Sequence, residues 1–250
     1  MIKALSLIIR TKNNRQNLAK IFEILKVQDF TGELEIILVD TESRDGTVEL
    51  AKENGAKIVS INQDDFSYPK SLNLGMKAAS HEIVAEIVGH ALPFTKSWLR
   101  SGIRHFDDPQ VAGVYSPVIP KNGATFTEIR WYYPGYLYHL FKGSHPVDKT
   151  GEGVFGATNI ILRRSLWEKH HFDERFGSGG EDGEWAEWAL KQGYKIICEP
   201  KFVIRHSHGL GRKEFKKQLS YWSTLGQPAE FNLQKLQFRK DLSETLRKKV

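Results

Sequence analysis

The 250-residue sequence holds a single cysteine and no long apolar run. One cysteine, Cys198, excludes a disulfide framework and indicates a reducing compartment. No stretch approaches the roughly 20 apolar residues of a membrane-spanning helix. The apolar run at residues 5–10 is too short for a signal peptide, so we expect a buried first strand there. These absences predict a cytoplasmic protein with one compact domain and a tail.

Excess positive charge is absent from most of the chain and is concentrated near its end. Residues 201–250 hold twelve Lys and Arg against four Asp and Glu, a net charge of +8, whereas residues 1–200 carry −2. This distribution disfavours a body that binds nucleic acid and favours a tail that faces an anion, such as a phospholipid surface, a phosphate-bearing substrate or RNA. Phe215, Leu219, Trp222 and Leu225 recur there at helical spacing, so this face either packs on the domain or lies on an anionic membrane.

Short apolar runs alternate with helical patterns through the first 90 residues. The alternation predicts an α/β fold, a mostly parallel sheet flanked by helices, with ligands bound at the carboxyl ends of the strands. We expect strands at residues 5–10, 35–39, 57–61 and 83–88, and helices at 17–26, 47–54 and 70–79. The aromatic segment 121–150 is too irregular for a prediction of secondary structure, and is either a loop over the core or the wall of a binding site.

Polar residues follow three of these strands. Thr11 follows the first strand, Asp40 the second and His90 the fourth. A carboxylate held at a strand end, such as that of Asp40, can accept hydrogen bonds from a nucleobase N–H or a ribose hydroxyl. The sequence after the first strand, residues 12–15, lacks glycine. This lack disfavours both a dinucleotide-binding dehydrogenase and a nucleotidyltransferase.

An acidic turn, Gly179-Gly180-Glu181-Asp182-Gly183, opens onto a helical pattern. Carboxylates at a helix start are favoured by the helix dipole, and the glycines let the backbone adopt conformations that other residues avoid. Such a turn either aims a base into a cleft or is a plain acidic N-terminus. A segment with Arg205, His206 and His208 follows it in the chain.

Several short motifs in this order resemble family 2 glycosyltransferases of the GT-A fold, of the non-processive, rhamnosyltransferase-like kind. The resemblance covers residues 3–210, with a donor half at about 1–100, an acceptor half at about 101–210 and a basic helical extension at 211–250. It is carried by Leu7-Ile8-Ile9-Arg10-Thr11-Lys12-Asn13, Val39-Asp40, Asp45-Gly46-Thr47, Ser71-Leu72-Asn73-Leu74-Gly75, His90-Ala91-Leu92-Pro93, Gly156-Ala157-Thr158-Asn159, Phe172-Asp173-Glu174 and Gly180-Glu181-Asp182.

The resemblance implies transfer of a sugar from a nucleotide-sugar donor to a hydroxyl of a glycan or a lipid-linked saccharide, with inversion. By position, Thr11 and Asp40 would hold the nucleoside and Lys70 would lie near the diphosphate. Asp182 would be the general base and Glu181 would bind acceptor or backbone. An inverting displacement needs a carboxylate within hydrogen-bond reach of the attacking oxygen, which agrees with these roles.

The sequence departs from the family at its metal motif. The usual Asp-x-Asp falls at Val88-Gly89-His90, and Thr41 replaces the second Asp of the common Asp-Asp pair. His90, with His206 or His208, would then hold Mn²⁺ or Mg²⁺, since imidazole is a competent ligand for transition metals. In the alternative, His90 caps the strand and the other two histidines contact phosphate or solvent.

Two other functions stay open at this stage. Val88 and Thr41 also fit a nucleotide-sugar-binding protein with impaired catalysis, although Glu181 and Asp182 argue against it. The basic tail also fits a module that docks on a membrane or a nucleic acid. We expect a nucleotide sugar and a saccharide or lipid-linked acceptor as partners, peripheral contact with the inner face of the membrane through residues 211–250, and no nucleic acid. The Gln-x-x-Arg-Trp element of processive synthases is absent after residue 182.

Overall fold

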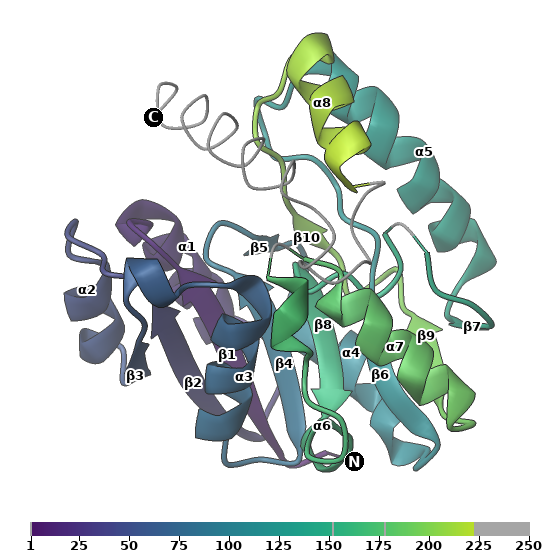
Figure 1. Cartoon of the computed structure of the whole chain (residues 1–250), viewed down its shortest axis with the longest axis horizontal. Helices are drawn as coiled ribbons and strands as arrows, with labels where there is room; N and C mark the ends of the chain where they lie inside the picture. The colour runs from purple at the N-terminus through teal and green to yellow at the C-terminus, as the bar shows by residue number, and fades with distance from the viewer. Residues whose placement is uncertain (1, 152, 178, 223–250) are drawn as a thin grey trace.

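The computed structural model describes residues 2–151, 153–177 and 179–222 (Figure 1). Eight strands form one sheet in the order β3-β2-β1-β4-β8-β6-β9-β7, and β5 pairs with β10 beside it. The strands are β1 (Ala4–Thr11), β2 (Glu33–Asp40), β3 (Lys57–Ser60), β4 (Ile83–Val88), β5 (Leu92–Pro93), β6 (Val111–Tyr115), β7 (His145–Val147), β8 (Asn159–Arg163), β9 (Lys195–Cys198) and β10 (Ile204–Arg205). The helices are α1 (Arg15–Lys26), α2 (Thr47–Glu53), α3 (Tyr68–Ala78), α4 (Trp98–Ile103), α5 (Phe126–Lys142), α6 (Arg164–Trp167), α7 (Glu181–Lys191) and α8 (Arg212–Trp222).

The N-terminal half of the sheet is parallel, as the alternation of strands and helices predicts. Strands β3, β2, β1 and β4 pair in parallel, and the register sets Thr11 beside Asp40. The second half is mixed, because β8 runs antiparallel to both β4 and β6, and β7 runs antiparallel to β9. The α/β prediction and the seven elements predicted in the first 90 residues are therefore confirmed.

Both faces of the sheet are covered, as the continuous apolar strands require. Alternate side chains of β1 point to opposite faces, so that Leu7 and Ile9 enter one core and Ile8 enters the other. Residues of α1, α2 and α4 join the first core, and residues of α3, α6 and α7 join the second. The alternation also puts Arg10 on the face of Ile8, among α3 and α7.

The aromatic segment 121–150 differs from the loop that we considered for it. Residues 126–142 form the 17-residue helix α5, which runs through Pro134. The helix begins with a capping box, because the Thr125 side chain accepts a hydrogen bond from Glu128 N and the Glu128 side chain accepts one from Thr125 N. Most of the segment is therefore a helix and not a loop, and the Thr-x-x-Glu signature of its start was present in the sequence.

The described part of the C-terminal extension is helical, as expected. Phe215 of α8 is buried against α5, with ring centroids 5.6 Å from Trp131 and 6.1 Å from Tyr132. Figure 1 shows the two helices side by side above the sheet. The predictions for Leu225 and the rest of 223–250 lie outside the described residues. Across the described chain, no helix is both long and apolar enough to span a membrane.

Candidate active site

The predicted donor residues lie at the carboxyl edge of the parallel strands. Thr11 ends β1 and Asp40 ends β2, and Thr41 N donates to Thr11 O at 3.0 Å. The Asp40 carboxylate is buried and accepts a hydrogen bond from Ser43 N at 2.9 Å. Thr11 Oγ1 is buried and has no hydrogen-bond partner among the described residues. A buried hydroxyl without a partner is costly, which marks this edge as a place for a polar ligand.

His90 follows β4 at the same edge, after a glycine that permits close approach. Gly89 N donates to Arg10 O at 2.7 Å. A Cβ atom at Gly89 would lie 2.5 Å from Thr11 Oγ1, far inside van der Waals contact. Only glycine therefore lets the backbone after β4 lie against Thr11.

The structure brings His90, His206 and His208 together. Strand β10 pairs antiparallel with β5, which sets Arg205 opposite Leu92 and carries the two later histidines next to His90. His206 Nε2 lies 3.0 Å from His90 Nε2. The potential ligand atoms of the three rings all lie within 4.8 Å of one another. The predicted grouping of these side chains is therefore observed, and we call it the histidine cluster.

The environment keeps the imidazoles neutral. Burial lowers the pKa of His90 to about 3, and the neighbouring His208 ring adds to this effect. Burial also lowers the pKa of His206 well below its ordinary value, and burial with the nearby Lys121 ammonium lowers that of His208. Neutral imidazoles offer the lone pairs that a metal needs. Three such donors fit a transition metal such as Mn²⁺ better than Mg²⁺, which prefers oxygen.

Glu128 of α5 holds the loop of the histidine cluster, and our reading of the sequence missed it. Its Oε1 accepts hydrogen bonds from His208 N at 2.8 Å and Gly209 N at 3.0 Å, and the residue is almost fully buried. The capping box at Thr125 was the sequence signal that could have singled it out. This carboxylate ties the start of α5 to the backbone that presents His208.

Asp182 stands in the first turn of α7, where the glycine-rich turn was predicted to aim it. Gly180, the N-cap, has φ 108°, a conformation that glycine adopts without strain. Asp182 Oδ2 accepts a hydrogen bond from Ala157 N at 2.7 Å, and Oδ1 accepts one from Gly183 N at 2.7 Å. Two backbone donors thus fix the orientation of this half-buried carboxylate.

A buried arginine binds the carbonyl group of the same residue, Ala157. Arg10 Nη2 donates to Ala157 O at 2.8 Å, and Arg10 Nε pairs with Glu86. Arg10 and Glu86 lie in strands that the sequence predicts as apolar. The sequence signal that could have singled them out is a lone charged residue in each strand. Ala157 therefore joins the Arg10 guanidinium to the Asp182 carboxylate through its own backbone.

Three carboxyl groups share the single Arg10 guanidinium. Burial raises the pKa of Glu86 to about 7, against the opposing charge of Arg10. Burial and the neighbouring charge of Asp182 raise the pKa of Glu181, whose Oε2 is buried with no partner in the described residues. Burial also raises the pKa of Asp182, while the Ala157 and Gly183 N–H groups oppose that rise. A carboxylate with a raised pKa is a stronger base near neutral pH.

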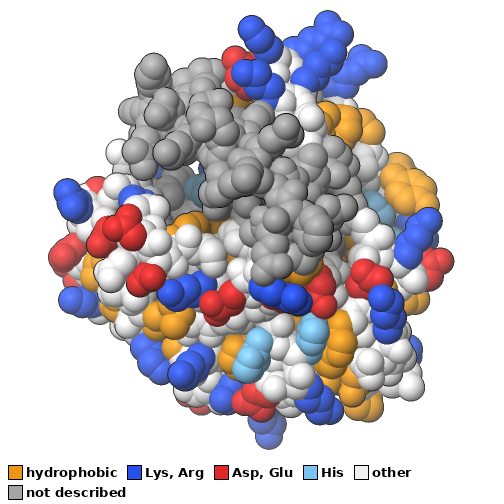
Figure 2. All heavy atoms as spheres, in the orientation of Figure 1, with side chains coloured by type: hydrophobic (Ala, Val, Ile, Leu, Met, Phe, Trp, Pro, Cys, Tyr) orange, Lys and Arg blue, Asp and Glu red, His pale blue; other side chains and the backbone are white. Residues whose placement is uncertain are grey.

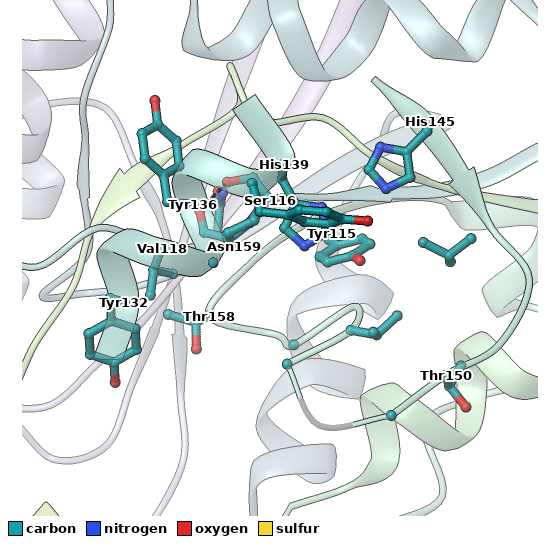
Figure 3. Close-up of a pocket in the computed structure, with 18 of the residues that line it drawn as sticks. Tyr115, Ser116, Val118, Tyr132, Tyr136, His139, His145, Thr150, Thr158 and Asn159 are labelled. Atoms are coloured by element: carbon teal, nitrogen blue, oxygen red, sulfur yellow. Dashed lines mark hydrogen bonds between the residues drawn. The ribbon is translucent and has the colours of Figure 1, made fainter. Parts of the chain in front are cut away.

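A cavity of about 900 Å³ extends from the histidine cluster beneath α5. Tyr132, Tyr136 and His139 of α5 line it, as do Thr158 and Asn159 (Figure 3). His206 lines the same cavity, and so do Gly156 and Thr158, the two neighbours of the residue that holds Asp182. His206 of the histidine cluster therefore lines this space, and the backbone segment that anchors Asp182 runs along it.

Lys70 is not brought to this group by any contact that the described residues show. It lies in the first turn of α3, where its backbone N–H donates to Ser67 Oγ at 3.2 Å. Its ammonium lies 3.4 Å from Asp65 Oδ1. The role of Lys70 near a diphosphate stays a prediction.

Comparison with known proteins agrees with this architecture. A relative in Salmonella typhimurium, the O-antigen chain rhamnosyltransferase RfbN, is 25% identical over 85% of this chain and 69% of that protein. WbaN of Salmonella anatum, also an O-antigen chain rhamnosyltransferase, is 25% identical over 73% of this chain and 60% of that protein.

Solved structures share the fold at low sequence identity. A mannosyltransferase of Pyrobaculum calidifontis, PcManGT, in complex with GDP-Man and Mn²⁺, has a TM-score of 0.66 at 17% identity. That match covers 89% of this chain and 62% of the neighbour. TarS of S. aureus has a TM-score of 0.61 at 20% identity, covering 97% of this chain and 43% of the neighbour. The chain thus spans less than two thirds of both neighbours.

A sequence profile, that of Glycosyl transferase family 2, matches residues 6–170. The matched region is more than half of the 250 residues and contains Thr11, Asp40 and His90. The chain belongs to glycosyl transferase family 2.

Proposed function

We propose that this protein transfers a sugar from a nucleotide-sugar donor to a hydroxyl group of a saccharide acceptor, with inversion, and that Asp182 is the general base. The observation that carries the proposal is the double backbone anchor of Asp182, from Ala157 N and Gly183 N. The two chain neighbours of Ala157, Gly156 and Thr158, line a large cavity. Such an anchor fixes a carboxylate in one orientation, which proton transfer from an acceptor hydroxyl requires.

The donor nucleoside binds, in this proposal, at the carboxyl edge of β1 and β2. Thr11 Oγ1 is buried without a partner among residues 2–151, 153–177 and 179–222, and can bond a nucleoside polar group. Asp40 lies beside it in the register of the sheet. The carboxyl ends of parallel strands are the usual place for nucleotides in α/β sheets. These features support the positions that the family resemblance implies for both residues.

The histidine cluster holds a divalent metal in this proposal, and Mn²⁺ suits its three imidazoles better than Mg²⁺ does. When bound, such an ion supplies positive charge for the departing diphosphate. His90 and His206 would be ligands, since their Nε2 atoms already face each other, and His208 would complete the set. Glu128 would hold the loop that carries His208 in place.

The acidic cluster would organise the base. Asp182 accepts the proton of the attacking hydroxyl, and its raised pKa strengthens it for that step. Arg10 is a positioning residue, because it binds the carbonyl of Ala157, the residue whose N–H binds Asp182. Glu181, buried next to Asp182, would contact acceptor or backbone.

The surface of α5 and α8 favours a lipid-linked acceptor, held at an anionic membrane. One side of α5 lines the cavity, while other side chains of the helix are exposed apolar groups, including Phe126, Leu137 and Phe141. Figure 2 shows basic side chains gathered over α8, next to hydrophobic ones along α5. Exposed aromatic groups beside exposed lysines match an interface with anionic lipid. A saccharide in the cavity could then keep its lipid in the membrane.

A donor panel tests the proposed activity. The protein is incubated with UDP-, dTDP- and GDP-sugars, with and without Mn²⁺, while thermal unfolding and slow donor hydrolysis are followed. A ligand that binds the native state raises the unfolding temperature. We expect one nucleotide class to stabilise the protein and to be hydrolysed more rapidly with Mn²⁺. Stabilisation without any hydrolysis or transfer would instead support the inactive nucleotide-sugar binder.

A further inference from the structure

A second group of metal-binding side chains borders the same cavity, away from the histidine cluster. His139 is near the end of α5, His145 begins β7, and Cys198 ends β9. Their potential ligand atoms all lie within 4.8 Å of one another. Figure 3 shows His139 and His145 together with Tyr115 on one side of the cavity. Three separate elements thus deliver two imidazoles and one thiol to one point.

The distances suit a tetrahedral metal site. Cys198 Sγ lies 3.4 Å from His139 Nδ1. With metal–sulfur and metal–nitrogen bonds of about 2.3 and 2.0 Å, two ligands at a tetrahedral zinc ion lie roughly 3.5 Å apart. The rings of His139 and His145 are parallel within 3°, with centroids 5.3 Å apart. Because the lone pair of an imidazole lies in its ring plane, one of these two rings must rotate for both to bind the same ion.

The hydrogen bond of His145 prepares it as a ligand. His145 Nδ1 lies 2.8 Å from Gly143 O, an acceptor only, so Nδ1 carries the proton and donates it there. The lone pair of the neutral ring is therefore on Nε2. This second contact, from a ligand histidine to a backbone carbonyl, is the usual way in which proteins fix the tautomer that binds a metal.

Cys198 has a simpler interpretation as a small core residue, since it is fully buried. Packing alone does not account for two imidazoles around the sulfur. His139 and His145 are only half-buried and line the cavity, so an ion entering from the cavity would reach them. The thiol also contacts Tyr115, whose hydroxyl is a hydrogen-bond partner of Cys198.

We propose that His139, His145 and Cys198 form a site for Zn²⁺ or another thiophilic divalent cation, separate from the histidine cluster. Binding breaks the S–H bond of Cys198, forms a metal–sulfur bond and releases the proton to solvent. Three protein ligands leave the fourth tetrahedral position open toward the cavity, for water or an oxygen of a bound ligand. The ion would tie α5 to β7 and β9 and so fix one side of the cavity.

Cobalt absorption tests this site directly, because Cys198 is the only cysteine in the chain. Co²⁺ bound to a thiolate gives an intense charge-transfer band in the near ultraviolet, and Co²⁺ bound to imidazoles alone does not. We expect the band when Co²⁺ is added to the wild-type protein, and its loss when excess Zn²⁺ is added. A His206→Ala variant should keep the band, which separates this site from the histidine cluster.

Two variants test the proposed ligands, and circular dichroism checks that the protein remains folded. Cys198→Ser should abolish the band, and His145→Gln, at a half-buried position, should weaken Co²⁺ binding about tenfold or more while circular dichroism stays native. Folded wild-type protein that shows no charge-transfer band at saturating Co²⁺ would overturn the proposal. A band that survives in Cys198→Ser, or unchanged Co²⁺ affinity in folded His145→Gln, would also overturn it. None of these three results would bear on Mn²⁺ at the histidine cluster.

Discussion

His90 Nε2 and His206 Nε2 lie 3.0 Å apart, although 116 residues separate them in the chain. Both rings are neutral, because burial lowers the pKa of each. One of the two nitrogens therefore carries a proton and the other a lone pair. If that proton moves to Nδ1 of the same ring, both Nε2 atoms carry lone pairs, and a divalent cation would gain two ligands that the fold has already brought together.

Loss of one histidine should weaken the response to Mn²⁺. We expect His206→Ala to lower the affinity for Mn²⁺ with donor about tenfold or more, since a missing ligand costs at least as much as a missing outer-shell partner. His90→Asp should retain part of the affinity, because a carboxylate also binds Mn²⁺. Thermal shift with Mn²⁺ and the best donor measures both effects.

His81→Ala is the matched control for that series. His81 lies just before β4, at the opposite end of the strand from His90, and its ring contacts Glu33. This variant should respond to Mn²⁺ like the wild-type protein. If His90→Ala and His206→Ala also respond like the wild-type protein, the histidine cluster does not bind metal.

The local features of the fold could be predicted from the sequence because they depend on short-range patterns. Apolar runs and helical spacing gave the strands and helices of the first 90 residues, and the strand ends gave Thr11, Asp40 and His90. The buried thiol of Cys198 was also expected. The grouping of His90 with His206 needed the family resemblance, since the pairing of β5 with β10 joins segments far apart in sequence.

Other parts of the site could not be predicted from local sequence patterns. Arg10 and Glu86 sit in apolar strands, and only tertiary packing shows that they pair with each other. Helix α5 was hidden by aromatic residues on all sides and by Pro134, which normally interrupts a helix. Its stability depends on packing against α8 and on the capping box at Thr125, and the first of these is a long-range contact.

The raised pKa of Glu86 makes stability depend on pH. Its carboxyl titrates near pH 7 in the folded protein and near 4.5 when unfolded, so the folded state binds more protons between these values. The free energy of unfolding should therefore fall as pH rises from about 4.5 to 7, by about 3 kcal/mol from this group. Glu86→Gln removes that contribution. The difference in the free energy of unfolding between the wild-type protein and this variant should therefore shrink as pH rises over this range.

Urea unfolding at pH 5 and pH 7.5 measures this change. Glu23→Gln is the control, because Glu23 is exposed on α1 and pairs only with Lys26 among the contacts described. Its difference from the wild-type protein should be small at both pH values. If Glu86→Gln also keeps a constant difference from the wild-type protein, Glu86 does not titrate in this range.

Membrane binding should depend on the exposed surfaces of α5 and α8. We expect the protein to sediment with vesicles that contain anionic lipid at low salt and to be released at high salt. Neutralising Lys213, Lys216 and Lys217 should weaken binding by about 3 kcal/mol, roughly 100-fold, at about 1 kcal/mol for each charge. All three side chains are exposed.

Two comparisons separate lipid binding from general electrostatic attraction. Phe141→Ser, at a side chain that is 89% exposed, should also weaken binding, because the lost contact is apolar. Neutralising exposed Lys26 and Lys52, on α1 and α2, should leave binding nearly unchanged. A wild-type protein that stays in the supernatant at low salt would assign this surface to another role.

The most direct test of the proposed catalysis is the turnover of Asp182→Asn, with Glu187→Gln on the same helix as control. Glu187 is exposed and pairs with Lys191, so its variant should keep normal turnover. Asp182→Asn should lower turnover about 100-fold or more, the usual contribution of a general base. Its affinity for the donor, followed by thermal shift, should stay within a few-fold of the wild-type value. Near-normal turnover of folded Asp182→Asn would contradict the assignment of Asp182 as the base.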